Sequence, residues 1–158
     1  MKKEELGIYI HIPFCMQKCL YCDFVSYPNK FEMQKKYIKK LIEEIEDNKE
    51  KLKNNEITTI YIGGGTPSSI NPELIKNIIN KICELGNVEN KENIEITIEV
   101  NPGTVTKENL QMYRDCGINR LSIGLQSTNN RLLKEIGRIH NYEQFLNTYN
   151  SSVEVGFN

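Results

Sequence analysis

Three cysteines at the end of the first apolar run are the residues of this chain best suited to chemistry. Cys15, Cys19 and Cys22 form a Cys-x3-Cys-x2-Cys triplet. Cubane iron–sulfur clusters in simple electron carriers take four cysteines, and a closed structural zinc site takes four protein ligands. Three thiolates therefore indicate a 4Fe–4S cluster with one iron left open to a small molecule. The alternatives are a zinc site completed by His11 or Asp23, and cysteines that are neighbours by chance.

A glycine-rich turn and two polar residues are the next candidates. Residues 63–65 are all glycine, and Thr66 and Pro67 follow them. The turn lacks both the Gly-Lys-Ser/Thr of a P-loop and Gly-x-Gly-x-x-Gly spacing. Because glycine has no Cβ, this backbone can approach a ligand closely, although a plain tight turn would use the same residues. Glu99 and Gln126 end later apolar runs, where each either contacts a ligand or pairs with a neighbouring side chain.

Alternating strands and helices must position these residues. The spacing predicts strands over residues 8–12, 58–62, 94–100 and 120–126. It predicts helices over residues 31–53, after the capping residues Asn71, Thr106 and Asn141, and in a short segment ending near Gly137. This alternation implies right-handed βαβ units and a parallel sheet. In such folds ligands bind at the carboxyl ends of the strands, where all the candidate residues fall.

Each predicted strand has one apolar and one polar face. In the third, the even-numbered residues 94–100 are Ile or Val, whereas Glu95, Thr97 and Glu99 alternate with them. Parallel strands covered by helices on both faces normally read as continuous apolar runs. Helices are therefore expected on one face only, and the polar face should line a cavity, as in a barrel with a lumen. The alternative is an antiparallel sheet with one face in water.

The length limits how much of a barrel this chain can form. An eight-fold barrel takes about 250 residues, or roughly 30 for each βα unit, so 158 residues hold four or five units. We therefore expect an α/β fold, a parallel partial barrel that is truncated before closure. Residues 1–158 would be the N-terminal portion of one domain, with the remaining strands and a C-terminal domain outside it.

Composition excludes several classes of protein. A net charge of −1 provides no field for nucleic acid or an anionic membrane, and no apolar run is long enough to span a bilayer. An odd number of cysteines, five, argues against a disulfide framework, and the N-terminus does not resemble a signal peptide. We expect a cytoplasmic protein in which Cys83 and Cys116 are ordinary buried thiols.

Five segments together carry a family resemblance. They are residues 9–24, 61–68, 99–103, 119–127 and 136–140, in order along nearly the whole chain. They resemble the radical S-adenosylmethionine family of oxygen-independent coproporphyrinogen III oxidase and its relatives. The resemblance implies a 4Fe–4S cluster on Cys15, Cys19 and Cys22, with S-adenosylmethionine chelating the open iron.

The same resemblance implies which residues surround the cofactor and what it does. By the family pattern the S-adenosylmethionine contacts are Tyr9, Tyr21, Gly64, Gly65, Thr66, Glu99, Gln126 and Arg138. The Arg138 guanidinium suits the carboxylate of the cofactor. One electron from the reduced cluster would cleave the sulfonium to methionine and a 5′-deoxyadenosyl radical, chemistry that belongs to the cofactor.

One position departs from the oxidase pattern. The oxidases resemble Cys-x3-Cys-x2-Cys-x-Cys, whereas here Phe24 stands in place of the last cysteine. That pattern resembles the heme-chaperone branch, which binds heme and transfers it to acceptor proteins, with a reductant as a further partner. Its heme-contacting residues would lie beyond residue 158. The alternatives are coproporphyrinogen oxidase, acting on a porphyrinogen, and a zinc-stabilised binding module without radical chemistry.

Overall fold

A four-stranded parallel sheet is the frame of the molecule. The computed structural model describes residues 3–157, and the strand order is β1-β4-β5-β6. The strands are β1 (Glu5–Ile12), β4 (Glu56–Gly64), β5 (Glu95–Val100) and β6 (Arg120–Ile123), all paired in parallel. The helices are α1 (Gln34–Asp47), α2 (Lys49–Asn54), α3 (Pro72–Leu85), α4 (Lys107–Asp115), α5 (Asn130–Glu135) and α6 (Tyr142–Val155). Short 3-10 helices cover Phe31–Met33, Pro67–Ser69 and Lys91–Asn93.

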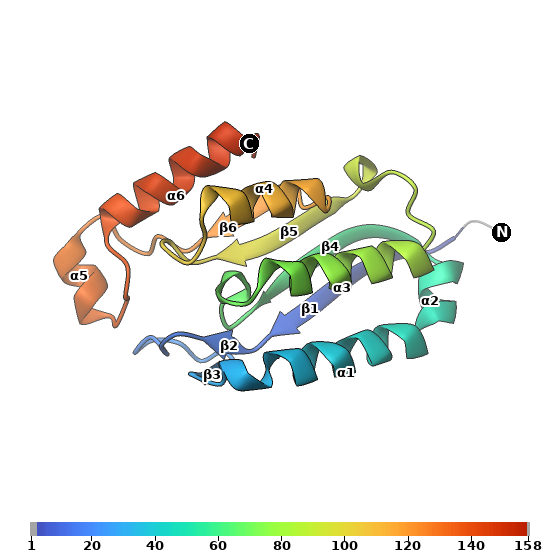
Figure 1. The fold of residues 1–158 in the computed structure, drawn as a ribbon, viewed down its shortest axis with the longest axis horizontal. Coiled ribbons are helices and arrows are strands. Elements are labelled where there is room, and N and C mark those ends of the chain that lie inside the picture. Colours follow the sequence, from blue (N-terminus) through green and yellow to red (C-terminus); the bar gives the residue numbers. More distant parts are fainter. Residues whose placement is uncertain (1–2, 158) are drawn as a thin grey trace.

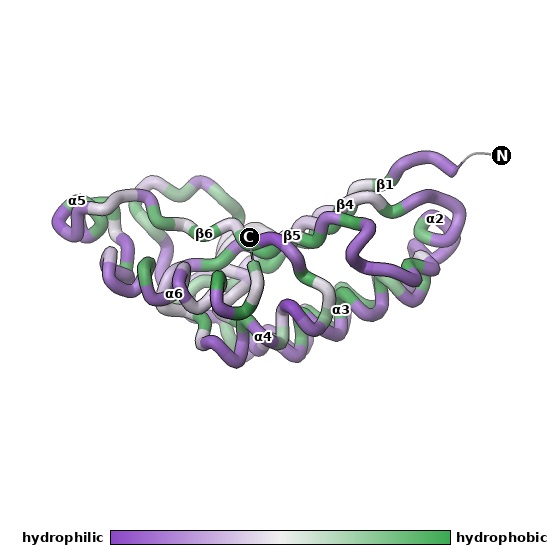
Figure 2. The backbone as a smooth tube through the Cα atoms, turned by 90° about the horizontal axis from the view of Figure 1, so that it is seen from above, coloured by the Kyte–Doolittle hydropathy of each residue, from purple (hydrophilic) through white to green (hydrophobic). Residues whose placement is uncertain are grey.

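The predicted apolar face is the face that the helices cover. Figure 2 shows α2, α3 and α4 along one side of the sheet, with the strands along the other. Ile62, Ile96 and Ile98 are fully buried there against Ile78 and Ile82 of α3. The sheet is open within residues 3–157, so the partial parallel barrel expected from the sequence is confirmed.

The predicted helix starts are also confirmed. The Asn71 side chain accepts a hydrogen bond from the Glu73 amide (2.9 Å), and Pro72 is the first residue of α3. Thr106 and Asn141 each form a reciprocal capping box at the start of α4 and α6. These caps satisfy backbone amides that have no partner within the helix.

Several predicted boundaries differ from the structure, in which β1 and β4 are both longer than the predicted strands 8–12 and 58–62. The fourth strand ends at Ile123 rather than residue 126, because Leu125 and Ser127 turn back to bond the carbonyls of Ile123 and Leu125. The helical segment 31–53 is divided, since Asn48 leaves the helical conformation between α1 and α2. Both the side-chain amide (2.9 Å) and the backbone amide (3.2 Å) of Asn48 donate to the Glu44 carbonyl at this break.

Two short parallel strands, which the sequence did not predict, flank the cysteine segment. They are β2 (Phe14–Cys15) and β3 (Tyr27–Pro28), which frame the loop between them. The Tyr27 amide donates to the Pro13 carbonyl (2.7 Å) and the Asn29 amide to the Cys15 carbonyl (3.0 Å). In Figure 1 this pair lies at the end toward which β1, β4 and β5 point. No helix within residues 3–157 is long and apolar enough to cross a membrane.

Candidate metal and cofactor site

A cavity of about 180 Å³ lies at the carboxyl ends of the strands. It gathers ten of the eleven site residues predicted from the sequence, which are Cys15, Cys19, Tyr21, Cys22, Gly64, Gly65, Thr66, Glu99, Gln126 and Arg138. They come from the carboxyl ends of β4 and β5, from the segments that follow β1, β4 and β6, and from the turn after α5. The parallel topology therefore brings together residues that are more than 100 positions apart in the chain.

Tyr9 is the predicted site residue that the cavity does not include. Its ring is exposed and stacks on Tyr61, with centroids 6.2 Å apart. The Tyr9 hydroxyl donates to Nδ1 of His11 (3.0 Å). Desolvation, with a smaller contribution from the Glu99 charge, raises its pKa. Tyr9 therefore contacts Tyr61, which bonds Glu99, but does not itself line the cavity.

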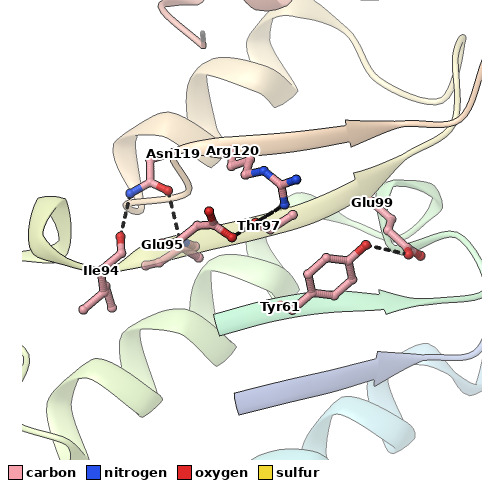
Figure 3. A network of polar contacts seen from close by, with 8 residues as sticks. Tyr61, Ile94, Glu95, Thr97, Glu99, Asn119 and Arg120 are labelled. Carbon is pink, nitrogen blue, oxygen red and sulfur yellow. Dashed lines mark hydrogen bonds and ion pairs between the residues drawn. The ribbon is translucent and has the colours of Figure 1, made fainter. Parts of the chain in front are cut away.

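The Glu99 carboxylate is fixed at the cavity wall by two donors. The Tyr61 hydroxyl donates to Oε1 (2.9 Å), as Figure 3 shows, and the Gly64 amide donates to Oε2 (3.1 Å). Gly64 can do so because its φ is +116°, a conformation open to glycine. Burial, and then the hydrogen bond to Glu99, raises the pKa of Tyr61. The carboxylate remains able to accept a bond from a hydroxyl or a cationic group in the cavity.

The three predicted cluster ligands lie along one wall of this cavity. Cys15 is buried, and its sulfur receives a hydrogen bond from Oγ1 of Thr66 (3.5 Å). The Cys19 sulfur lies 3.7 Å from Nη1 of Arg138. The Leu20 amide donates to the Ile136 carbonyl (3.1 Å), which ties the loop to the turn after α5. Cys15, Cys19 and Cys22 all line this one cavity, so a single ligand there can contact all three residues.

The zinc alternative would need His11 or Asp23 as its fourth ligand. Within residues 3–157 no three His, Cys, Asp or Glu side chains are grouped as a metal-ion site. His11 is also engaged at both ring nitrogens. Its Nδ1 accepts from Tyr9, and its Nε2 lies 2.8 Å from the Val25 carbonyl, to which it donates.

Gly65 gives a direct test of how tightly the cysteine segment is packed. A Cβ at this position would lie 2.8 Å from the Phe14 carbonyl oxygen and 2.9 Å from the Cys15 sulfur. Because backbone cannot move aside cheaply, Gly65→Ala is expected to displace Cys15 and to lose most of the bound iron. The measurement is iron and sulfide content after reconstitution without oxygen. The matched control is Gly7→Ala in β1, whose Cβ would meet only the Thr59 hydroxyl (3.1 Å); equal iron in both variants would contradict the expectation.

Arg138 is held by an unusually complete set of acceptors. Its Nη2 donates to Oδ1 of Asn101 and to the Gly124 carbonyl, both at 2.8 Å, and its Nε donates to Nδ1 of His140 (3.3 Å). His140 in turn donates from Nε2 to the Leu125 carbonyl (3.2 Å). Burial, and then the Arg138 charge, lowers the pKa of His140. The imidazole is therefore neutral and can accept from Nε, so the Nη1 edge is what Arg138 offers to a ligand.

Besides Phe24, six residues of the lining were not among the predicted site residues: Gln17, Lys18, Val100, Asn101, Ser122 and Gly124. The signal for Asn101 was present, because Asn101-Pro102 directly follows β5 at the ligand-binding edge. Gln126 was assigned to the end of a strand, but it lies three residues beyond β6 with a φ of +67°. Such a conformation is costly for a residue other than glycine and is concentrated at functional sites.

Comparisons with known proteins agree with this geometry. A model of the Radical SAM superfamily matches residues 9–158. The heme chaperone HemW of Buchnera aphidicola subsp. Acyrthosiphon pisum is 41% identical over 154 residues, which cover 97% of this chain and 40% of that protein. HemW of Escherichia coli is 38% identical over 141 residues, covering 89% and 37%.

A solved structure shows the same fold. The coproporphyrinogen III oxidase HemN of Escherichia coli, described as a radical SAM enzyme, superposes with a TM-score of 0.87. It is 28% identical, and the match covers 99% of this chain and 36% of that one. The chain thus spans about two fifths of the length of the curated relatives above.

Proposed function

This chain belongs to the radical SAM superfamily, and on that premise we propose that it is the N-terminal part of a heme chaperone. Cys15, Cys19 and Cys22 would hold a 4Fe–4S cluster, since they are the thiols that line the cavity. When bound, the cluster and S-adenosylmethionine supply one-electron cleavage of the sulfonium. The protein holds both in place and limits access of water.

The remaining lining residues have roles that follow from their donors and acceptors. Arg138 presents its Nη1 edge to a carboxylate, and Glu99 accepts from a hydroxyl or amino group. Gln126 presents an amide from its left-handed turn. Gly64, Gly65 and Thr66 bring backbone next to the ligand, and Tyr21 closes the cysteine side of the cavity. Desolvation raises the pKa of Tyr21, and this effect exceeds the lowering by the Arg138 charge. The phenol therefore remains protonated.

The observation that carries the choice of chaperone is Phe24. An oxidase would have a further cysteine at this position, whereas Phe24 lines the cavity with a side chain 65% exposed. The matches to proteins named heme chaperones support the same choice. The alternative is coproporphyrinogen oxidase activity, which the likeness to the solved oxidase favours.

The test uses the full-length protein, purified and reconstituted without oxygen. We expect it to bind heme and to pass it to a heme-free acceptor protein, and to release no carbon dioxide from coproporphyrinogen III. Absorption spectra report heme binding and transfer, and radiolabelled substrate reports decarboxylation. Decarboxylation without heme transfer would instead establish the oxidase function.

The location and the other partners belong to the same proposal. All five cysteines are free thiols, which suits a reducing compartment, and we place the protein in the cytoplasm. An electron donor must reduce the cluster, and an acceptor protein must take the heme.

A further inference from the structure

We infer that Asn101 is a positioning residue that connects the hydrogen-bond donors of two cluster cysteines and thereby raises the reduction potential of the cluster. This rests on the proposed function. Asn101 does not touch a cysteine, and it lies just after β5 with its side chain between two segments of the site.

The contacts of Asn101 form an unbroken chain. Its Nδ2 donates to Oγ1 of Thr66 (3.0 Å), and Thr66 donates to the sulfur of Cys15 (3.5 Å). Its Oδ1 accepts from Nη2 of Arg138 (2.8 Å), and Nη1 of that guanidinium lies 3.7 Å from the sulfur of Cys19. One amide therefore bonds the donors to two of the three thiols, and helps the Gly124 carbonyl and His140 to hold Arg138.

The direction of each bond requires an amide at this position. Because the Thr66 hydroxyl has a single proton and donates it to the Cys15 sulfur, its oxygen must accept in its bond with Asn101. The Nδ2 group of Asn101 is the donor in that bond. Arg138, in contrast, has no lone pair and needs an acceptor. Only a side chain with both a donor and an acceptor satisfies Thr66 and Arg138 together.

The backbone around Asn101 is held separately from its side chain. The Asn101 amide donates to Oγ of Ser68 (3.1 Å), and its carbonyl accepts from Oγ1 of Thr104 (2.7 Å). Ser68 and Thr104 also bond each other (2.6 Å). Truncating the Asn101 side chain should therefore leave the loop in place and remove only its two side-chain bonds.

The effect on the cluster follows from charge. A reduced cluster carries one more negative charge, and donors aimed at its cysteine sulfurs stabilise that state. The bonds lie in a partly buried site, where they are stronger than in water. Weakening them makes the cluster harder to reduce.

The test is an anaerobic redox titration of the full-length reconstituted protein, followed by electron paramagnetic resonance. Asn101→Ala is expected to keep its iron and sulfide but to show a ratio of reduced to oxidised cluster about tenfold lower at a fixed potential. Tenfold corresponds to 59 mV for one electron. The isosteric Asn101→Asp also lacks the donor to Thr66 and is expected to shift in the same direction, so the test does not depend on one variant folding.

Asn119→Ala is the matched control. Asn119 also makes two side-chain bonds, to the Ile94 carbonyl (2.7 Å) and the Ile96 amide (2.9 Å), but it lies at the opposite end of the sheet (Figure 3). This variant should lose stability and keep the potential of the unaltered protein. If Asn119→Ala shifted the potential as much as Asn101→Ala, the inference would be overturned.

Variants of Thr66 test whether Asn101 acts on the Cys15 sulfur through the Thr66 hydroxyl. Thr66→Val should lower the reduction potential of the cluster. Thr66→Ser should have the potential of the unaltered protein, because serine keeps the hydroxyl. Combined with Asn101→Ala, Thr66→Val should add less than its separate shift, since both act on the Cys15 sulfur. An unchanged potential in Asn101→Ala and Asn101→Asp with full iron would refute the inference alone. An unaltered protein that takes up no cluster would refute the proposed function, and the inference with it.

Discussion

Replacing any one of Cys15, Cys19 or Cys22 by Ala is expected to abolish both the 4Fe–4S chromophore and the cleavage of S-adenosylmethionine. With three protein ligands, each thiolate holds a different iron, so loss of one leaves two open corners and an unstable cluster. The measurements are iron and sulfide content, absorption in the visible range and release of methionine, all without oxygen. Activity should fall to the level of the uncatalysed background.

Cys83 and Cys116 provide matched controls within the same chain. Both are buried, in α3 and just after α4, and burial raises the pKa of each thiol. Neutral, buried thiols are poor metal ligands. Cys83→Ala and Cys116→Ala should keep the cluster and the cleavage activity. A full 4Fe–4S complement in Cys19→Ala would refute the assignment of the ligands.

The second large effect separates the two faces of the sheet at adjacent residues of β5. Ile98 has 0% exposure on the helix-covered face, and Ile98→Ala should cost about 2–5 kcal/mol of unfolding free energy, the usual range for such a change. Glu99 lines the cavity on the other face. Glu99→Ala removes a charged acceptor worth about 1.5–3 kcal/mol, so S-adenosylmethionine should bind roughly 10- to 100-fold more weakly.

Denaturant unfolding and calorimetric titration measure the two effects on the full-length protein. Each variant serves as the control for the other. Ile98→Ala should change binding little if the protein stays folded. Glu99→Ala frees the Tyr61 hydroxyl and the Gly64 amide next to the open cavity, and should change stability less than Ile98→Ala does. The reverse pattern, with Glu99→Ala unfolding the protein, would mean that the two faces of the sheet are exchanged.

Local rules account for what was predictable in the fold. Asn71, Thr106 and Asn141 start helices because each cap needs only its own side chain and the next three residues. The alternation along β5 placed Ile98 and Glu99 on opposite faces because side chains of a strand alternate. The cysteine spacing indicated a cluster, and the cavity brings all three thiols together.

What was missed depends on contacts between distant segments. Asn101 joins Thr66 to Arg138, and nothing in the spacing of these residues reveals the direction of its two bonds. Tyr9 has the correct parity but stacks on Tyr61, which occupies the space toward Glu99. The strand before Gln126 ends early because its neighbours bond locally rather than across the sheet.

The contacts between the cysteine loop and the turn after α5 also set the order in which the site can be completed. Cys19 and Arg138 are 119 residues apart, and the Leu20 amide reaches forward to Ile136. During synthesis the three thiols leave the ribosome long before the segment that braces them. Until that segment folds, the loop rests on β2 and β3 alone and its thiols are open to oxidation. We therefore expect cluster insertion to follow the folding of that segment, with the nascent thiols needing a reducing environment until then.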